Sequence, residues 1–91
     1  MVKLSEHDKK VKRIAAGYRG KGWDVRADLP DDKPPKPIHG KTPDIVATKG
    51  KRAIIVEVET DQSFDKDKNQ RAIFRDYAKG KSRTKFRWTT V

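Results

Sequence analysis

Acidic side chains near the middle of the chain have the types and the spacing of a divalent-metal site. Asp44 follows Pro43, and Glu57 lies thirteen residues further along the chain. Neighbouring strands lie about 4.8 Å apart, so an aspartate and a glutamate on matching faces of a hairpin can share one divalent ion. Such an ion activates water and neutralises the charge of a phosphate, which is the chemistry of phosphodiester hydrolysis. The alternative is that these are solvated carboxylates paired with surface lysines.

The charge along the chain places these carboxylates between two basic segments. The 91 residues carry 23 Lys+Arg against 13 Asp+Glu, a formal net charge of +10. Residues 1–22 have a net charge of +5, residues 23–62 of −1, and residues 63–91 of +6. Central carboxylates would repel a phosphate backbone unless a divalent cation lay between them. The pattern therefore predicts a nucleic acid partner and a metal ion.

Length and composition exclude several classes of protein. A chain of 91 residues suits one domain with a modest core, which excludes a two-domain enzyme with a separate cofactor module. The longest apolar run, Ala53 to Val56, is far shorter than a membrane span, so no membrane partner is expected. The chain has no cysteine and no apolar signal segment at its start. We therefore expect a cytoplasmic protein without disulfides or thiolate metal sites.

Hydrophobic periodicity predicts the elements that position the carboxylates. Apolar residues at helical spacing predict helices over 5–20 and 63–79, and alternation predicts strands over 23–29, 42–48, 52–60 and 86–90. Four prolines and a glycine in 30–41 predict a mobile loop. The third strand is apolar on both faces, so we expect it to be central, with Glu57 and Glu59 on one face at its end. Burying acids there is costly unless they are paired or metal-bound.

The order αβββαβ, the pair Pro43-Asp44 entering one strand and the triplet Glu57-Val58-Glu59 ending the next resemble the PD-(D/E)xK nuclease superfamily. The resemblance covers essentially the whole chain and is to its small RecB-like and Holliday-junction-resolvase-like cores. It implies a single α/β domain over 1–91 with the restriction-endonuclease-like fold, a central mixed four-stranded sheet flanked by helices. It also implies a nuclease that uses Mg²⁺ or Mn²⁺ to hydrolyse DNA, leaving 5′-phosphate and 3′-hydroxyl ends.

The resemblance assigns metal-binding roles to particular residues. Asp44 and Glu57 would be the metal-binding carboxylates, and the carbonyl of Val58 would be a further ligand. Glu6 matches an acidic residue in the first helix of several branches of the superfamily. Gln70 matches a glutamine that RecB-like branches place near the site, although a helix-flank amide is the alternative.

Position 59 departs from the pattern, which has a lysine where this chain has Glu59. Glu59 would be an additional metal ligand or a base that orients water. Lys68, or else Lys66, would supply the amine from the second helix. If neither reaches the site, the chain would be a noncatalytic nucleic-acid-binding or regulatory protein with the nuclease fold. A third alternative, an RNA-binding or ribosome-associated protein, requires the carboxylates to be exposed and dispersed.

Other side chains have expected places on the surface or in the core. The residues expected to contact phosphates are Lys9, Lys12, Arg13, Lys41, Arg71, Arg75, Lys79, Lys81 and Arg83. The four aromatic residues Phe64, Phe74, Tyr77 and Trp88 lie on predicted buried stripes, so we expect them in the core rather than on a base-stacking surface. His7 is expected at the core edge and His39 in solvent. So small a core is expected to dimerise or to act beside a partner protein.

Overall fold

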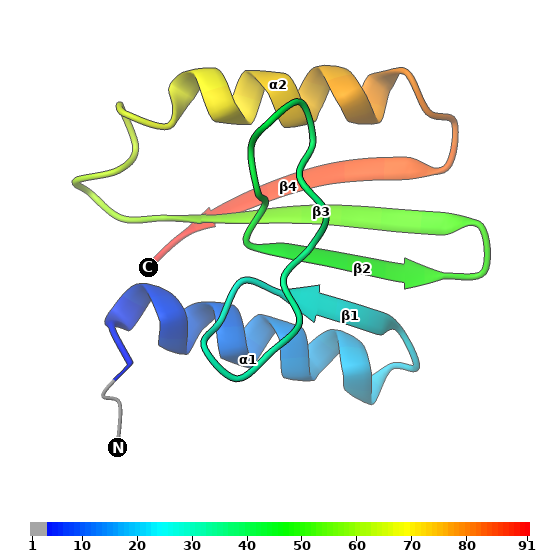
Figure 1. The fold of residues 1–91 in the computed structure, drawn as a ribbon, viewed down its shortest axis with the longest axis horizontal. Coiled ribbons are helices and arrows are strands. Elements are labelled where there is room, and N and C mark those ends of the chain that lie inside the picture. The colour runs from blue at the N-terminus through cyan, green and yellow to red at the C-terminus, as the bar shows by residue number, and fades with distance from the viewer. Residues whose placement is uncertain (1–3) are drawn as a thin grey trace.

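A computed structural model describes residues 4–91, in which two helices flank one sheet of four strands (Figure 1). The elements are α1 (Glu6–Gly20), β1 (Asp24–Ala27), β2 (Ile45–Lys49), β3 (Arg52–Glu59), α2 (Lys68–Lys79) and β4 (Thr84–Thr90). This is the predicted αβββαβ order, and the α/β class is confirmed. None of the helices in residues 4–91 has the length and apolar character needed to cross a membrane.

The sheet is mixed, with strand order β1-β2-β3-β4. The strands β1, β2 and β3 form an antiparallel meander, whereas β4 runs parallel to β3 after the crossover through α2. Because β4 is parallel to β3, Glu57 lies beside Trp88 in the register, and Glu59 lies beside Thr90. The mixed four-stranded sheet is therefore confirmed, and the likeness to restriction endonucleases stays a prediction.

Helix α1 packs on the face of β3 that carries Ile54, Val56 and Val58. Its start is capped by Ser5, whose Oγ accepts a hydrogen bond of 3.1 Å from the peptide N–H of Asp8. Val11 and Ala15 are fully buried against that face of the sheet. The opposite face of β3 is thereby left for Glu57 and Glu59, as the alternation of the strand predicts.

Helix α2 begins at Lys68, later than the predicted start at residue 63. Residues 61–67 form turns instead, because the hydroxyl of Ser63 is engaged with the backbone of the preceding strand. Its Oγ accepts from the N–H of Thr60 at 2.8 Å and donates to Glu59 at 2.8 Å. From Lys68 onward the helix is regular, and it buries Phe74 fully, 6.2 Å from the ring of Phe86 in β4.

The proline-rich segment crosses the sheet and reaches α2, as the green loop in Figure 1 shows. A tight turn at its tip pairs Ile38 with Lys41, and the two turn residues, His39 and Gly40, have positive φ angles of 51° and 80°. The ring of His39 meets the ring of Tyr77 at 6.2 Å between centroids. A cleft of about 530 Å³ lies between the loop and the sheet. His39 therefore contacts an aromatic ring of α2, which the sequence analysis did not predict.

Candidate metal centre and its surroundings

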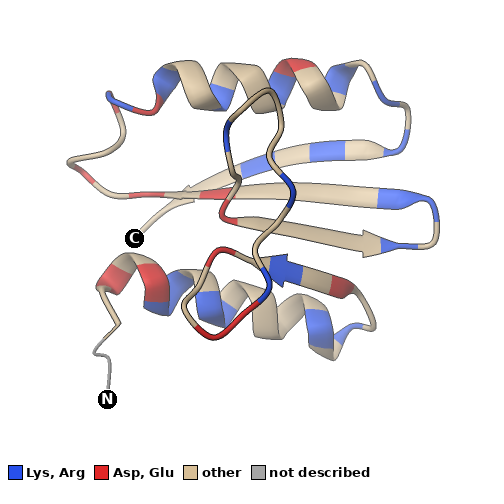
Figure 2. Cartoon of the chain, viewed as in Figure 1, with Lys and Arg blue, Asp and Glu red and all other residues tan. Residues whose placement is uncertain are grey.

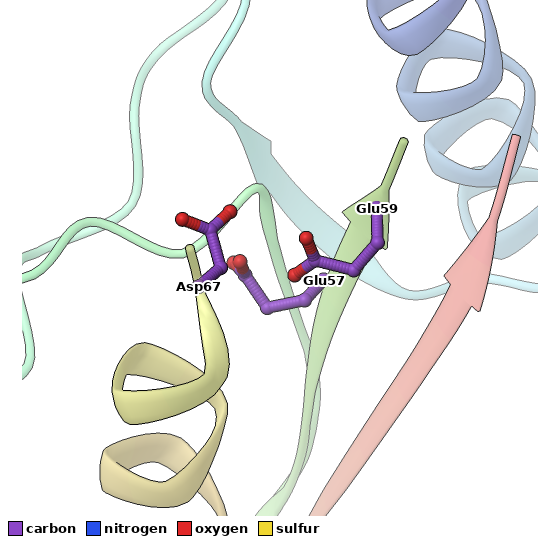
Figure 3. Close-up of side chains that lie close together, drawn as sticks. All are labelled: Glu57, Glu59 and Asp67. Carbon is purple, nitrogen blue, oxygen red and sulfur yellow. The ribbon is translucent and has the colours of Figure 1, made fainter. Parts of the chain in front are cut away.

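Three carboxylates meet where β3 ends and α2 begins. Glu57, Glu59 and Asp67 each place an oxygen within 4.8 Å of the others, and we call these three residues the acid cluster (Figure 3). Figure 2 shows further acidic positions at the same end of the molecule, at the starts of α1 and α2. Carboxylate oxygens are the ligands that Mg²⁺, Mn²⁺ and Ca²⁺ prefer in proteins. The acid cluster is therefore the candidate metal centre.

Glu57 is held in place by one hydrogen-bond donor on each carboxylate oxygen. Its Oε1 accepts from the peptide N–H of Asp44 at 2.8 Å, and its Oε2 accepts from the amide of Gln70 at 3.1 Å. The residue is only 2% exposed. Burial, together with the nearby charges of Asp44 and Glu59, raises the pKa of Glu57 to about 8. A nearby cation would favour the ionised form that burial disfavours.

Glu59 is fully buried, and one of its oxygens has no hydrogen-bond donor. Oε2 accepts the 2.8 Å hydrogen bond from Ser63, whereas Oε1 accepts none among the described residues. The nearest cation to Oε1 is Arg71, whose Nη1 lies 3.5 Å away. Burial raises the pKa of Glu59, and the charge of Asp67 raises it further, although the hydrogen bond from Ser63 opposes this. A buried acceptor without a donor is costly, and a metal ion would satisfy it.

Asp67 occupies the N-cap position of α2 without capping the helix. An aspartate at this position ordinarily accepts a hydrogen bond from the backbone of the first turn, but the side chain of Asp67 accepts none there. Figure 3 shows its carboxylate directed toward Glu57 and Glu59 instead. Sequence reasoning missed Asp67, since its contribution depends on where α2 begins. Its position at the helix start was the only signal available.

Asp44 lies beside the acid cluster and has partners of its own. Its Oδ2 accepts a hydrogen bond of 2.8 Å from the peptide N–H of Val58 and lies 3.3 Å from Nε2 of His7. Burial raises the pKa of Asp44, although these two contacts oppose the shift. Asp44 and Glu57 are thus cross-linked between β2 and β3, each accepting from the backbone of the other strand. Val58 takes part through its N–H group, while the predicted role of its carbonyl stays a prediction.

His7 is the second residue of the site that sequence reasoning missed. Its Nδ1 lies 3.0 Å from Oδ1 of Asp8, and its Nε2 faces Asp44. Burial lowers the pKa of His7, but the hydrogen bonds and charges of Asp8 and Asp44 outweigh it, so the pKa stands above its ordinary value. His7 orients Asp44 from α1. By contrast, Glu6 points to solvent with 76% of its side chain exposed and pairs with Lys9.

The lysines expected to replace the missing amine do not form ion pairs with the acid cluster. Lys66 and Lys68 are exposed, and in residues 4–91 the only ion pair of the cluster is the one between Glu59 and Arg71. Arg71 itself is 6% exposed, so it is not a surface phosphate contact in this structure. The other basic residues predicted to bind phosphate are exposed, namely Lys9, Lys12, Arg13, Lys41, Arg75, Lys79, Lys81 and Arg83.

The prediction that all four aromatic residues belong to the core is wrong for two of them. Phe74 is fully buried as predicted, and Tyr77 is half-buried. Phe64 is 36% exposed and Trp88 is 44% exposed. The reason is positional: β4 is an edge strand, and Phe64 lies in the turn before α2 rather than on a helical stripe. Their two rings contact each other, with centroids 5.4 Å apart.

Comparison with models of known protein families and with curated proteins gave no match to this chain.

Proposed function

We propose that this chain hydrolyses nucleic acid phosphodiesters, DNA in the first place, with a divalent cation such as Mg²⁺ or Mn²⁺ at the acid cluster. The observation that carries the proposal is the fully buried Glu59, whose Oε1 has no hydrogen-bond donor and faces a cluster of three carboxylates. In a protein of net charge +10, this concentration of buried negative charge is selective rather than general. Perturbed, clustered carboxyl groups of this kind are typical of functional sites.

The charge balance of the acid cluster supports a bound cation. Three carboxylates within 4.8 Å repel one another, and a single arginine lies near only one of them. Without a further cation, the cluster has to retain protons, as the pKa of about 8 for Glu57 indicates. A hard divalent ion with oxygen ligands would replace those protons at neutral pH.

The ligands that the geometry favours differ in part from those that the resemblance implies. Glu57 is common to both sets, Glu59 and Asp67 come from the acid cluster, and Asp44 comes from the resemblance. One oxygen of Asp44 already accepts the N–H of Val58. We therefore propose Glu57, Glu59 and Asp67 as ligands, with Asp44 fixing the backbone that holds Glu57.

The residues around the metal have separable roles in hydrolysis. A bound divalent ion would lower the pKa of water and offset the charge that builds up on the phosphate. Gln70 and the N–H of Asp44 fix the orientation of Glu57, and His7 fixes Asp44. The oxygen of the attacking water bonds to phosphorus, and the bond from phosphorus to the 3′ oxygen breaks. A cluster carboxylate accepts the proton of the water, and the 3′ oxygen takes one from solvent, leaving 5′-phosphate and 3′-hydroxyl ends.

The test is a cleavage assay with matched carboxamide variants. Purified protein is incubated with single-stranded, duplex and branched DNA and with RNA, in Mg²⁺, Mn²⁺ or EDTA. We expect metal-dependent cuts that Glu57→Gln and Glu59→Gln abolish, whereas Glu6→Gln, at an exposed position of α1, retains them. Absence of cutting on every substrate with either metal would overturn the proposal.

A second candidate, a noncatalytic nucleic-acid-binding protein, is favoured by the basic group at the cluster. That group is Arg71, and an arginine stays protonated in proteins and cannot accept a proton from water. This candidate predicts salt-sensitive DNA binding that metal does not convert into cutting. The RNA-binding alternative with exposed, dispersed carboxylates is disfavoured, since Glu57 and Glu59 are buried together. A cytoplasmic location and a dimeric or partner-bound state stay predictions.

A further inference from the structure

A shallow groove with two exposed aromatic rings lies beside the acid cluster. Its volume is about 390 Å³, within the range of small-ligand sites. The residues that line it and carry the argument are Phe64, Asp65, Lys68, Arg71, Arg75 and Trp88. We call it the aromatic groove. Phe64 and Trp88 are the only large aromatic side chains of residues 4–91 that are classed as exposed.

The two rings are held in place by Arg71, which lies beneath them. Its guanidinium carbon lies 4.1 Å from the centroid of Phe64 and 5.7 Å from that of Trp88. Nη1 of Arg71 donates a hydrogen bond of 2.7 Å to the carbonyl of Phe64. Because Arg71 is itself buried and paired with Glu59, the rings rest on a fixed support. An exposed aromatic surface that is already ordered loses little entropy when a flat ligand stacks on it.

The charges around the aromatic groove suit an anionic ligand. Lys68 and Arg75 line it from α2, are exposed, and form no ion pair with any residue of 4–91. Asp65 is the single carboxylate of the lining. Basic side chains beside aromatic rings are the arrangement that binds unpaired nucleotides, with phosphates on the cations and bases on the rings.

The aromatic groove and the acid cluster share one boundary. Arg71 lines the groove and contacts Glu59, Lys68 directly follows Asp67, and Trp88 lies beside Glu57 in the register of the sheet. A strand lying in the groove therefore extends toward the acid cluster. The bases of an intact duplex are stacked on each other and cannot stack on protein rings, so this surface selects unpaired nucleotides.

We propose that the aromatic groove binds single-stranded nucleic acid, with bases on Phe64 and Trp88 and phosphates on Lys68 and Arg75. The inference rests on the proposed function for the fate of the strand, which the groove would lead to the acid cluster. It needs no metal for binding. A failure to cleave and a failure to bind are therefore separate results.

Tryptophan fluorescence gives a direct test, because the chain has two tryptophans, Trp23 and Trp88. In the Trp23→Phe variant the signal comes from Trp88 alone, and in Trp88→Phe it comes from Trp23 alone. Both are titrated with oligo(dT) in EDTA at low salt, and with a closed DNA hairpin duplex. We expect oligo(dT) to quench Trp88 and not Trp23, and the closed duplex to quench neither.

Binding by labelled oligo(dT) then checks the role of the rings. Loss of one stacking partner should weaken binding about 5- to 150-fold in Phe64→Ala and Trp88→Ala, whereas Trp88→Phe retains it. Circular dichroism shows which variants are folded, and the quenching test needs neither alanine variant. Equal quenching by duplex, unchanged affinity of folded alanine variants, or a dimer in sedimentation that already covers Trp88 would each overturn the proposal.

Discussion

Oε1 of Glu59 lies 3.5 Å from Nη1 of Arg71, and both side chains are almost wholly excluded from solvent. This pair joins the two functional surfaces of the molecule. Glu59 belongs to the acid cluster, and Arg71 supports the aromatic groove. The separation leaves room for competition, because a cation bound by Glu59 would take over part of the charge that Arg71 now balances.

Removing Arg71 should destabilise the protein through the charge it leaves behind. We expect Arg71→Met to lower the free energy of unfolding by about 3 kcal/mol, the lower end for an uncompensated buried charge, because Glu59 can take up a proton. The double variant Arg71→Met/Glu59→Gln should recover part of the loss. Urea unfolding measures both, with Arg75→Met as an exposed control on the same helix expected within about 0.5 kcal/mol of wild type. A double variant no more stable than Arg71→Met would contradict this account.

The acid cluster should make the metal-free protein less stable as pH rises. The pKa of Glu57 is raised from 4.5 to about 8, so between these values the folded state keeps a proton that the unfolded state has lost. Stability from this group is complete below about pH 4.5 and is lost by about pH 8, on the order of a few kcal/mol. Urea unfolding of wild type and Glu57→Gln across this range isolates the effect. Parallel pH profiles of the two proteins would show that the pKa of Glu57 is ordinary.

Glu57→Gln is a suitable comparison because the hydrogen-bond pattern can be kept. The new amide oxygen can accept the N–H of Asp44, and the new amide nitrogen can donate to Gln70 once the Gln70 amide reverses. The variant thus removes the titration while it preserves the packing.

Metal binding should stabilise the protein and identify the ligands. A divalent ion at about 100 times its Kd adds about 2.7 kcal/mol to the free energy of unfolding. We expect Mn²⁺ to raise the Tm of wild type at pH 7.5 and to have little effect on Glu59→Gln. Asp67→Asn should lose most of the shift, and Asp44→Asn less of it, if the acid cluster supplies the ligands. The reverse order would assign the metal to the Asp44 and Glu57 pair of the resemblance.

Salt dependence should separate the exposed cations from the buried one. The logarithm of affinity for oligo(dT) should fall linearly with the logarithm of salt concentration, and each lost phosphate contact should reduce that slope by about 0.7. Arg75→Ala should show this reduction. Folded Arg71→Met should keep the wild-type slope, because Arg71 is buried against Glu59. Equal reductions in both variants would place Arg71 among the phosphate contacts after all.

Much of the fold follows from local patterns in the sequence. The alternation of Ile54, Val56 and Val58 against Ile55 and Glu57 specifies a central strand with acids on one face, because side chains of a strand alternate between faces. Helical spacing on either side of the strands then determines the order of elements. The start of α2 was placed too early, since Ser63 bonds to Thr60 and Glu59 instead of joining the helix.

The sequence by itself therefore determined the αβββαβ order, the basic flanks and the nearness of Glu57 and Glu59. The tertiary structure brought Asp67 to the acid cluster, His7 to Asp44, and Phe64 to Trp88. It also turned Arg71, which looked like a surface cation, into the buried partner of Glu59. Periodicity reports which face of its own element a side chain occupies. Contacts between elements depend on where each helix begins and how it packs on the sheet, and no local pattern encodes these.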